Sequence, residues 1–414
     1  MTSSLSAADR VAPRTSWHIP AMLALALGGF GIGTTEFVTM GLLPDIAADF
    51  RITEPTAGHA VSAYALGVVV GAPLIAALCA RVPRKKLLIA LMAAFTVGNA
   101  ATVLAPTFGS LVAARFVSGL PHGAYFGVAS LAAATLAPAG QRAKAVAAVM
   151  LGLSVANVVG VPGATWLGQH LGWRDAYVVV AIIGVATVAA LWRFVPPLTT
   201  MTITDPRTEL GALRRPQVLL TLAVGAIGFG GMFAVYTYIA TTMTDVAGLS
   251  VGAVPIVLAL FGLGMIAGNV LGGILADRGV DRSIFAALLA MVVILAGFVL
   301  AAHNPVTAAL GAFLVGASGA ALAPGLQTRL MDVAADAQTL AAALNHAALN
   351  IANAAGAWLG GLVIAAGLGY TAPAAVGAVL AIAGVLLFTT TVWLARRVSP
   401  SSRSAPISTT SPRG

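Results

Sequence analysis

The sequence predicts an all-α integral membrane protein with twelve transmembrane helices, arranged as two six-helix bundles that form a parallel repeat. Three observations lead to this fold class. The chain is 59% hydrophobic and only 8% charged, whereas soluble domains carry about 25% charged residues. Apolar runs of about 20 residues, each long enough to cross a bilayer, recur along the chain. The two halves also match each other at an offset of 197 residues.

Each apolar run is expected to be a helix, because backbone groups in hydrocarbon must be satisfied within the segment. Pro and Gly clusters or charged groups separate the runs. Residues 1–17 precede a first run of about 26 residues, which is too long for a signal-peptide core, so we expect this run to be retained as a span. The expected spans are 18–43, 57–79, 87–105, 109–135, 145–169, 176–196, 217–243, 251–276, 283–302, 305–331, 339–366 and 373–395.

The basic residues predict the orientation of the chain. With a cytoplasmic N-terminus, 19 of the 22 Lys and Arg residues fall on the cytoplasmic side; Arg51 and Arg174 fall outside and Arg115 lies within a span. This bias places both termini in the cytoplasm. The basic residues behind the net charge of +9 therefore set the membrane topology, and we expect no nucleic-acid binding.

The same reading divides the chain into five parts. They are a cytoplasmic tail at 1–17, a first bundle at 18–196, a cytoplasmic linker at 197–216, a second bundle at 217–395 and a tail at 396–414, which is rich in Ser, Pro and Thr and expected to be disordered.

An internal repeat supports the division into halves. At the offset of 197 residues, Gly67 and Gly71 fall on Gly264 and Gly268, Arg81 falls on Arg278, and Phe116 falls on Phe313. Chance matching in a Gly- and Ala-rich chain is the alternative, but one offset shared by separate spans favours duplication. Six spans per half is an even number, so both halves insert in the same orientation and form a parallel repeat.

Two charged residues lie well inside apolar segments, Glu36 and Arg115. A charge at membrane depth costs about 3 kcal/mol or more and is usually functional. At the helical rise per residue, Glu36 lies roughly 11 Å and Arg115 roughly 10 Å below the outer ends of their spans. We therefore expect them to meet, directly or through a water, and to form a proton-coupling pair; a purely structural ion pair between two helices is the alternative.

Other polar residues in the spans are candidates for proton transfer or solute binding. His122 shares the helix face of Arg115 and could relay protons, since His titrates near neutral pH, or be a satisfied packing residue. Span 11 carries three amides and an imidazole, which suit a solute cavity or interhelical hydrogen bonds about equally. The expected cavity residues are Thr35, Asn157, Phe233, Tyr236, Asn345, His346, Asn350 and Asn353, with Tyr238 as a further candidate.

Several chemistries are not expected. The chain has no GxxxxGK[ST], HExxH or GxSxG motif and no acid-rich cluster in its spans, so we expect no ATP-driven step, no enzyme activity, no metal and no cofactor. Cys79 is the only cysteine, which excludes an intramolecular disulfide. The expected partners are protons, lipid and a small solute. The protein is expected to be a monomer.

Four stretches carry a family resemblance. TTEFVTMGLLPDIA in span 1, RFVSGLPHGAYFG in span 4, GLSVANVVGVPGATWLG in span 5 and LNHAALNIANAAGAWLGG in span 11 resemble the major facilitator superfamily. The similarity covers about residues 18–395 and points to the twelve-span drug:proton antiporter branch, near the sugar (arabinose) and chloramphenicol efflux permeases. It implies the major facilitator fold and a proton-coupling role for Arg115. It also implies an antiporter motif in span 5 at Gly160, Pro162, Gly163 and Gly168.

One loop departs from the family pattern. The motif Gly-x-x-x-Asp-Arg-x-Gly-Arg-Lys is usual between spans 2 and 3, but here Ala80 replaces the Asp and Pro83 replaces the Gly. Arg81 and Arg84 remain, and the second-half copy keeps Asp277 and Arg278. Charge latching on the cytoplasmic side is therefore expected to depend on the second-half copy.

These observations lead to one expected function and three alternatives. We expect a secondary active transporter that exports a small amphiphilic solute in exchange for protons by alternating access. A solute:proton symporter, a membrane signalling or assembly protein without transport, and a passive channel are the alternatives. Arabinose-like sugars, chloramphenicol-like drugs and purine nucleosides are all compatible solutes.

Overall fold

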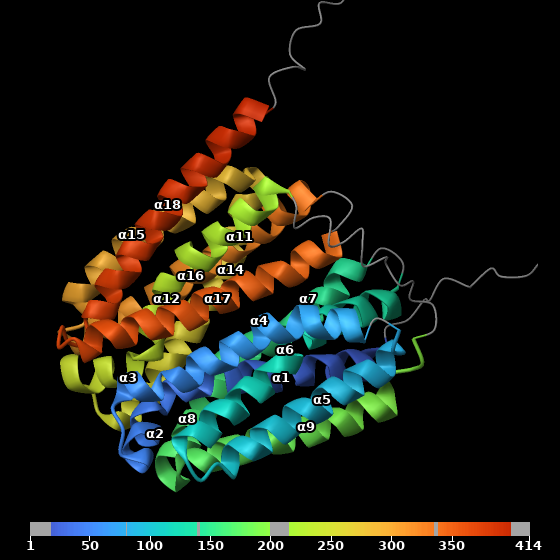
Figure 1. Cartoon of the computed structure of the whole chain (residues 1–414), viewed down its shortest axis with the longest axis horizontal. Helices are drawn as coiled ribbons and strands as arrows, with labels where there is room; N and C mark the ends of the chain where they lie inside the picture. Colours follow the sequence, from blue (N-terminus) through green and yellow to red (C-terminus); the bar gives the residue numbers. More distant parts are fainter. Residues whose placement is uncertain (1–17, 80, 139–140, 199–214, 335–337, 399–414) are drawn as a thin grey trace, which may run out of the picture.

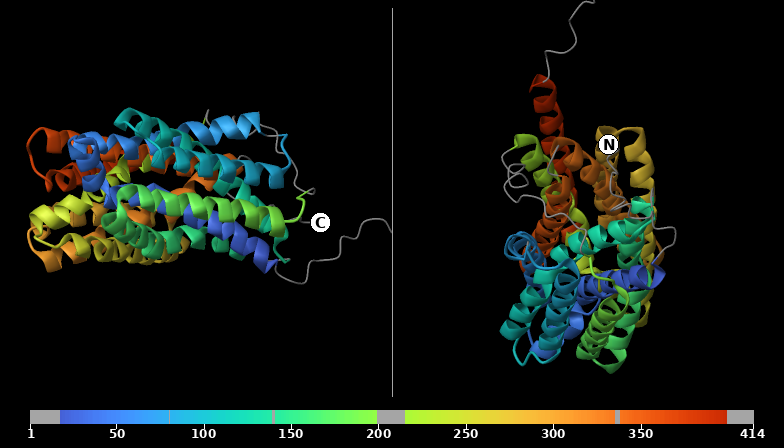
Figure 2. Two further views of the ribbon diagram at one scale, coloured as in Figure 1. Left: turned by 90° about the horizontal axis from the view of Figure 1, so that it is seen from below. Right: turned by 90° about the vertical axis from the view of Figure 1, so that its right-hand side faces the viewer.

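The computed structural model describes residues 18–79, 81–138, 141–198, 215–334 and 338–398. The expected tail at 1–17, most of the linker at 197–216 and most of the tail at 396–414 lie outside these ranges, as does Ala80. Within them, twelve long helical spans form two bundles. The spans run roughly along the long axis of the molecule, and the two bundles lie next to each other across it (Figures 1 and 2). The expected fold class is confirmed.

The first bundle contains six spans and two short helices. Span 5 is made of three segments, because a π-helical turn separates α7 from α8. The elements are α1 (Ile19–Gly41), α2 (Leu43–Phe50), α3 (Glu54–Ala57), α4 (His59–Leu78), α5 (Arg84–Val103), α6 (Phe108–Leu136), α7 (Arg142–Val155), η1 (Ala156–Gly160), α8 (Val161–Leu171) and α9 (Trp173–Phe194).

The second bundle repeats this plan, and its first span is the interrupted one. The elements are α11 (Pro216–Gly228), α12 (Gly230–Thr237), α13 (Ile239–Thr241), η3 (Thr242–Val246), η4 (Val251–Ala253), α14 (Val254–Arg278), α15 (Val280–Ala301), α16 (Pro305–Ala334), α17 (Gln338–Ala365) and α18 (Ala372–Val398). Helix α18 runs two residues past the expected start of the tail at 396.

Within the described residues, eleven helical stretches are long and apolar enough to cross a membrane. Helix α6 is 29 residues long but less apolar, since it carries Arg115 and His122. Large apolar side chains are exposed on both bundles, among them Leu23, Leu104, Trp192, Val293 and Leu300. Extended apolar surface of this kind marks contact with lipid.

The packing of α4 on α6 is repeated by α14 on α16. A Cβ atom built on Gly71 would lie 2.0 Å from the Leu120 carbonyl oxygen, and one built on Gly268 would lie 2.0 Å from that of Ala317. Both glycines and both carbonyl residues are 197 positions apart. The helices approach each other through the same backbone contact in each half, which supports duplication over chance matching.

The two bundles touch at the end of the molecule that carries α2, α3 and the turn between α17 and α18; we call it the α2–α3 end (left in Figure 1). The Ser62 hydroxyl on α4 donates a hydrogen bond of 3.0 Å to the Ala354 carbonyl on α17. Tyr238 fills the space beside Gly58 and Gly361 and donates to the Ala357 carbonyl. The start of α1 and the end of α18 lie at the opposite end (Figure 1).

Candidate functional site

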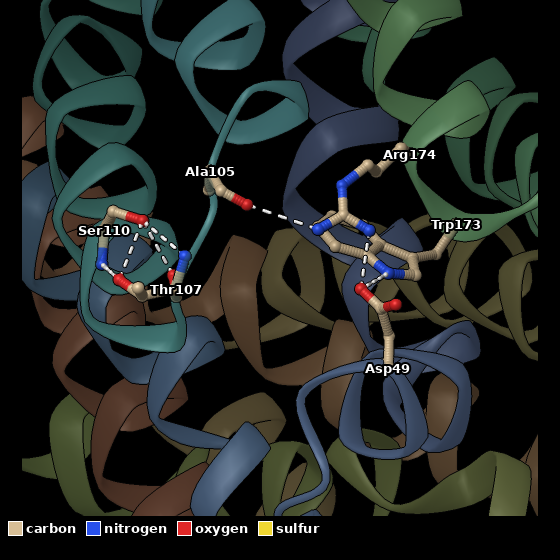
Figure 3. A network of polar contacts seen from close by, with 6 residues as sticks. All are labelled: Asp49, Ala105, Thr107, Ser110, Trp173 and Arg174. Atoms are coloured by element: carbon tan, nitrogen blue, oxygen red, sulfur yellow. Dashed lines mark hydrogen bonds and ion pairs between the residues drawn. The ribbon is translucent and has the colours of Figure 1, made fainter.

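The start of α6 is fixed by polar contacts at the α2–α3 end, shown in Figure 3. The Thr107 hydroxyl accepts from the Ser110 backbone N–H, and the Ser110 hydroxyl accepts from the Thr107 backbone N–H, a capping box that satisfies two free donors. Arg174 at the start of α9 donates to Asp49 on α2 and to the Ala105 carbonyl, just before α6. These contacts set the position of the helix that carries Arg115.

The Asp49–Arg174 ion pair lies outside the spans and is partly exposed. Hydrogen bonds from the Arg174 guanidinium and from the Trp173 indole lower the pKa of the Asp49 carboxyl. The lowered pKa means that the pair stabilises the fold above the unfolded-state value and is lost as the pH falls through the folded-state value. Exposed ion pairs contribute about 1 kcal/mol or less, so this pair aligns α2 and α9 more than it stabilises them.

Arg115 is completely buried, and its partners belong to the first bundle. Its two terminal nitrogens donate to the Thr35 hydroxyl (3.0 Å) and the Thr35 carbonyl (2.9 Å). The guanidinium lies 4.4 Å from the ring centre of Tyr64 and 5.4 Å from that of Tyr177. Arg115 therefore ties α6 to α1, α4 and α9, and only its Nε lacks a hydrogen-bond partner.

Glu36 follows Thr35 on α1 and is 6% exposed. Among the described residues the ion pairs are Arg174–Asp49 and Arg329–Asp281, so Glu36 and Arg115 form no direct ion pair, and their contact through a water stays a prediction. The Arg115 charge and the Asn353 amide of α17 both act electrostatically on the Glu36 carboxylate. Because Arg115 binds Thr35, the next residue Glu36 lies near the level of Arg115, and its interactions with Asn353 and Tyr236 show that it faces the second bundle.

His122 and Tyr64 extend this buried polar cluster. The Tyr64 hydroxyl and His122 Nδ1 are 3.0 Å apart and share a hydrogen bond. The Phe126 ring then lies between His122 and His346 of α17, stacked on the latter at a centroid distance of 5.9 Å. Contacts thus run from Arg115 through Tyr64 to His122, which suits both expected roles of His122, relay and packing.

An aromatic group lies next to Glu36, at the boundary between the bundles. The Phe37 ring of α1 stacks on Phe233 at 6.3 Å and contacts Tyr236 at 5.7 Å. Tyr236 in turn stacks on Phe261 of α14 at 3.8 Å. The cluster brings together the two expected residues Phe233 and Tyr236.

The amides of α17 are buried but only partly hydrogen-bonded. Asn345 donates to Gln327 of α16 and Asn350 donates to the His346 carbonyl, while the side-chain oxygen of each amide has no partner. Asn353 is 1% exposed, and neither of its amide atoms makes a hydrogen bond of good geometry, although the amide lies close enough to the Glu36 carboxylate to act on it. Unpaired buried polar groups are rare, so these amides are candidates for binding a solute or ordered water.

Three expected cavity residues lie elsewhere. The Thr35 hydroxyl is engaged by Arg115 and donates to Asn99. Asn157 lies in η1 beside Gly262, at a crevice of about 40 Å³ that Asn269 also lines. Tyr238 belongs to the packing of the α2–α3 end.

The expected motif residues have mixed surroundings. Gly160 faces Thr34 on α1, Pro162 is buried at the start of α8, and a Cβ on Gly163 would meet nothing within 4 Å. Arg81 is exposed and Arg84 begins α5. Asp277 and Arg278 form no ion pair in the part of the chain that the structure describes; Arg329 binds Asp281 instead, within the second bundle. The role of Asp277 and Arg278 in charge latching on the cytoplasmic side therefore stays a prediction.

Sequence reasoning missed Tyr64 and a polar contact across the α2–α3 end. The Thr241 hydroxyl of α13 donates to the Glu54 carboxylate of α3, and Asp245 and Tyr370 also act on Glu54. A pocket of about 640 Å³ at this end is lined by Glu54 and Tyr370 among others. Glu54 lies at the edge of an expected span, where a charge is unremarkable, so no pattern singled it out.

The Glu54–Thr241 contact is expected to help hold the two bundles together at the α2–α3 end. Hydrogen bonds to charged groups contribute about 1.5–3 kcal/mol. Val61 is buried against residues of the second bundle, so Val61→Cys provides a thiol that reacts only when this end opens. Thr241→Val should raise the reactivity of that thiol by about tenfold. The measurement is the rate of maleimide labelling of the purified protein, in a background where Cys79 is replaced by serine.

Thr244→Val is the matched control, because Thr244 bonds only within its own segment. Equal labelling rates for Thr241→Val and the parent would show that the contact does not hold this end closed.

Two duplicated bundles with a buried polar and aromatic cluster between them form the architecture of a membrane transporter. The chain belongs to the Major Facilitator Superfamily, whose family model matches residues 25–304 and 238–412. This is a family of membrane transporters and not of enzymes, and the resemblance noted in the sequence is confirmed.

Individual relatives agree with the family. The chain is 42% identical to the inner membrane transport protein YdhP of Escherichia coli K12, over 92% of this chain and 97% of that protein. It is 37% identical to a chloramphenicol resistance protein of Streptomyces lividans, over 84% of this chain and 88% of that protein. A D-xylose–proton symporter of known structure matches the fold with a TM-score of 0.74 at 17% identity, over 91% of this chain and 97% of the symporter.

Proposed function

We propose that this protein is a proton-coupled antiporter that exports a small amphiphilic solute from a bacterial cell by alternating access. In this proposal the chain lies in the inner membrane with both termini in the cytoplasm, so the α2–α3 end faces outward. The names of its relatives support this proposal, since a chloramphenicol resistance protein is consistent with export and an inner membrane transport protein with the location. The positive-inside bias supports the orientation.

The observation that carries proton coupling is the buried carboxylate of Glu36, at the boundary between the bundles and within electrostatic reach of Arg115. A carboxylate in this position can hold a proton in one conformation and release it in another, because movement of α1 against the second bundle changes its surroundings. Tyr64 and His122 extend the cluster along the first bundle and provide hydroxyl and imidazole groups for a proton path.

Contacts between the bundles support alternating access. The bundles meet at the α2–α3 end through Ser62, Glu54 and Tyr238, all of which make contacts that a rocking motion would break. One positive charge that moves inward across 100 mV supplies about 2.3 kcal/mol, and a pH gradient adds to it. This free energy would drive the solute outward.

The test is transport in inverted membrane vesicles with an acidic lumen, using chloramphenicol and a panel of sugars and nucleosides. An antiporter takes up its solute against a concentration gradient as protons leave the lumen, and a protonophore abolishes the accumulation. A symporter expels preloaded solute under the same gradient. Equilibration that ignores the gradient indicates a passive channel, and the absence of any transport would favour a signalling or assembly protein.

A further inference from the structure

The hydrogen-bonding groups around Glu36 indicate which class of solute this site accepts, given the proposed transport function. Four neutral buried atoms in this region have no hydrogen-bond partner: the Tyr236 hydroxyl, the Asn350 side-chain oxygen and both amide atoms of Asn353. The Arg115 Nε is also unpartnered, but its guanidinium lies against the Tyr64 and Tyr177 rings. Tyr236 and Asn353 both lie within electrostatic reach of Glu36. Asn350 precedes Asn353 by three residues on α17 and therefore shares its helix face.

These unpartnered groups are neutral. The Asn353 nitrogen donates, the two amide oxygens accept, and the Tyr236 hydroxyl can do either. A buried polar atom without a partner costs about 1–3 kcal/mol, which a ligand bearing complementary groups recovers. The set therefore suits a solute with both donors and acceptors, such as hydroxyls or amides.

The charges in the same region cancel while Glu36 is ionised, and the Arg115 terminal nitrogens stay bound to Thr35 when Glu36 is protonated. Arg115 is the buried cation near Glu36, and its terminal nitrogens are bound to Thr35 while its faces lie against Tyr64 and Tyr177. Only the Arg115 Nε is left unpaired, on a guanidinium that the two rings cover, so an anionic solute finds no accessible cation. When Glu36 is ionised, Arg115 balances its charge, so a cationic solute finds no net negative charge either.

The aromatic rings beside these polar groups provide an apolar surface. Phe37 of the first bundle and Phe233 of the second stack on each other, and Tyr236 stacks on Phe261. Aromatic faces favour flat apolar groups, while the amides on α17 face the polar part of the same solute. Because the rings come from both bundles, a solute that packs against them would contact both halves during the conformational change.

We propose that Tyr236, Asn350 and Asn353, with the Phe37–Phe233 ring pair, form a binding site for an uncharged amphiphile that carries hydroxyl or amide groups, and that the site discriminates against charged solutes. Tyr236 and Asn353 are the specificity-determining residues, because each presents unpartnered hydrogen-bonding atoms next to Glu36.

Solute charge is tested with probes of one scaffold in the inverted vesicles. Chloramphenicol succinate is anionic, and its methyl ester is neutral and nearly the same size; ethidium serves as a cationic probe. We expect gradient-driven uptake of chloramphenicol and the methyl ester, with uptake of the succinate and of ethidium lower by at least about tenfold. Equal uptake of charged and neutral probes would overturn this inference while leaving proton-coupled export intact. Lack of uptake of every probe would overturn both.

Two variants test the residues. Tyr236→Phe removes one unpartnered hydroxyl, and Asn353→Leu removes both unpartnered amide atoms at similar volume. We expect KM for chloramphenicol to rise about two- to tenfold for Tyr236→Phe, the effect of one neutral hydrogen bond, and further for Asn353→Leu. Thermal stability without solute should stay equal or increase, since a buried unpaired group is removed.

Thr237→Val is the control, because the Thr237 hydroxyl is buried next to Tyr236 but already bonded to the Phe233 carbonyl. It should leave KM unchanged. A merely structural role for Tyr236 and Asn353 predicts the opposite pattern, a loss of stability with an unchanged KM, and that result would overturn the assignment.

Discussion

Replacing Glu36 with glutamine is expected to abolish the response of transport to the pH gradient while solute exchange continues. Glutamine keeps the size and hydrogen-bonding capacity of the side chain but cannot bind and release a proton at physiological pH. Glu36 forms no ion pair in the part of the chain that the structure describes, so the substitution breaks no salt bridge of the fold. The effect should therefore fall on coupling and not on folding.

The measurement is solute accumulation in inverted vesicles with the membrane potential clamped at zero. With one proton exchanged per solute, each pH unit supports about tenfold accumulation at equilibrium, because one unit is worth about 1.4 kcal/mol. We expect this ratio to fall to about one in Glu36→Gln, with counterflow of labelled solute retained. Asp49→Asn is the control, since Asp49 is a partly exposed carboxylate at the α2–α3 end. Equal accumulation by Glu36→Gln and the parent would remove Glu36 from the coupling mechanism.

Much of the fold could be predicted because a bilayer allows few solutions. Hydrophobic length identified the spans, and most observed helices begin and end within a few residues of the expected positions. Pro162, which lacks a backbone N–H, favours a bend in span 5 next to the observed interruption, but the π-helical form of that interruption could not be predicted. The π-helical turn at Ala156–Gly160 lies where the Asn157 backbone packs against Gly262 of the other bundle, a contact that no local pattern encodes. Helices α2 and α3 were also missed, since they are short and cap the ends of spans.

For the site, the sequence predicted the membrane depth of Glu36 and Arg115 but not the side chains that each one contacts. The rise per residue placed Glu36 and Arg115 at one level, but the rotation of α1 about its axis decides which side chain faces α6. That rotation turns Thr35 to Arg115 and Glu36 to the second bundle. Tyr64 was missed because a tyrosine in an apolar span carries no distinctive signal. The internal repeat offers a weak signal, since Tyr64 corresponds to Phe261 at the offset of 197 residues. Tyr64 contacts Arg115, and Phe261 stacks on Tyr236.

The largest expected effect on folding comes from adding one methyl group at the repeated glycine positions. A Cβ on Gly268 would lie 2.0 Å from the Ala317 backbone carbonyl oxygen, and α14 cannot move away without losing its packing against α16. We expect Gly268→Ala to destabilise the protein by about 3 kcal/mol, at the upper end for an overpacked core. Gly71→Ala should do the same in the first bundle, where the Leu120 carbonyl oxygen is the obstacle.

Gly273→Ala on the same helix and Gly127→Ala on α6 are the matched controls, because a Cβ at either position would meet nothing within 4 Å. Alanine is the better helix former, so both controls should be neutral or more stable by up to about 1 kcal/mol. The measurement is the fraction of each variant that remains monodisperse in detergent after heating. Since membrane helices lack a hydrophobic force between them and depend on close contact, the loss should appear only where the backbones touch. If Gly268→Ala and Gly273→Ala were equally stable, the helices would not approach each other through these glycines, and the structural argument for duplication would lose its support.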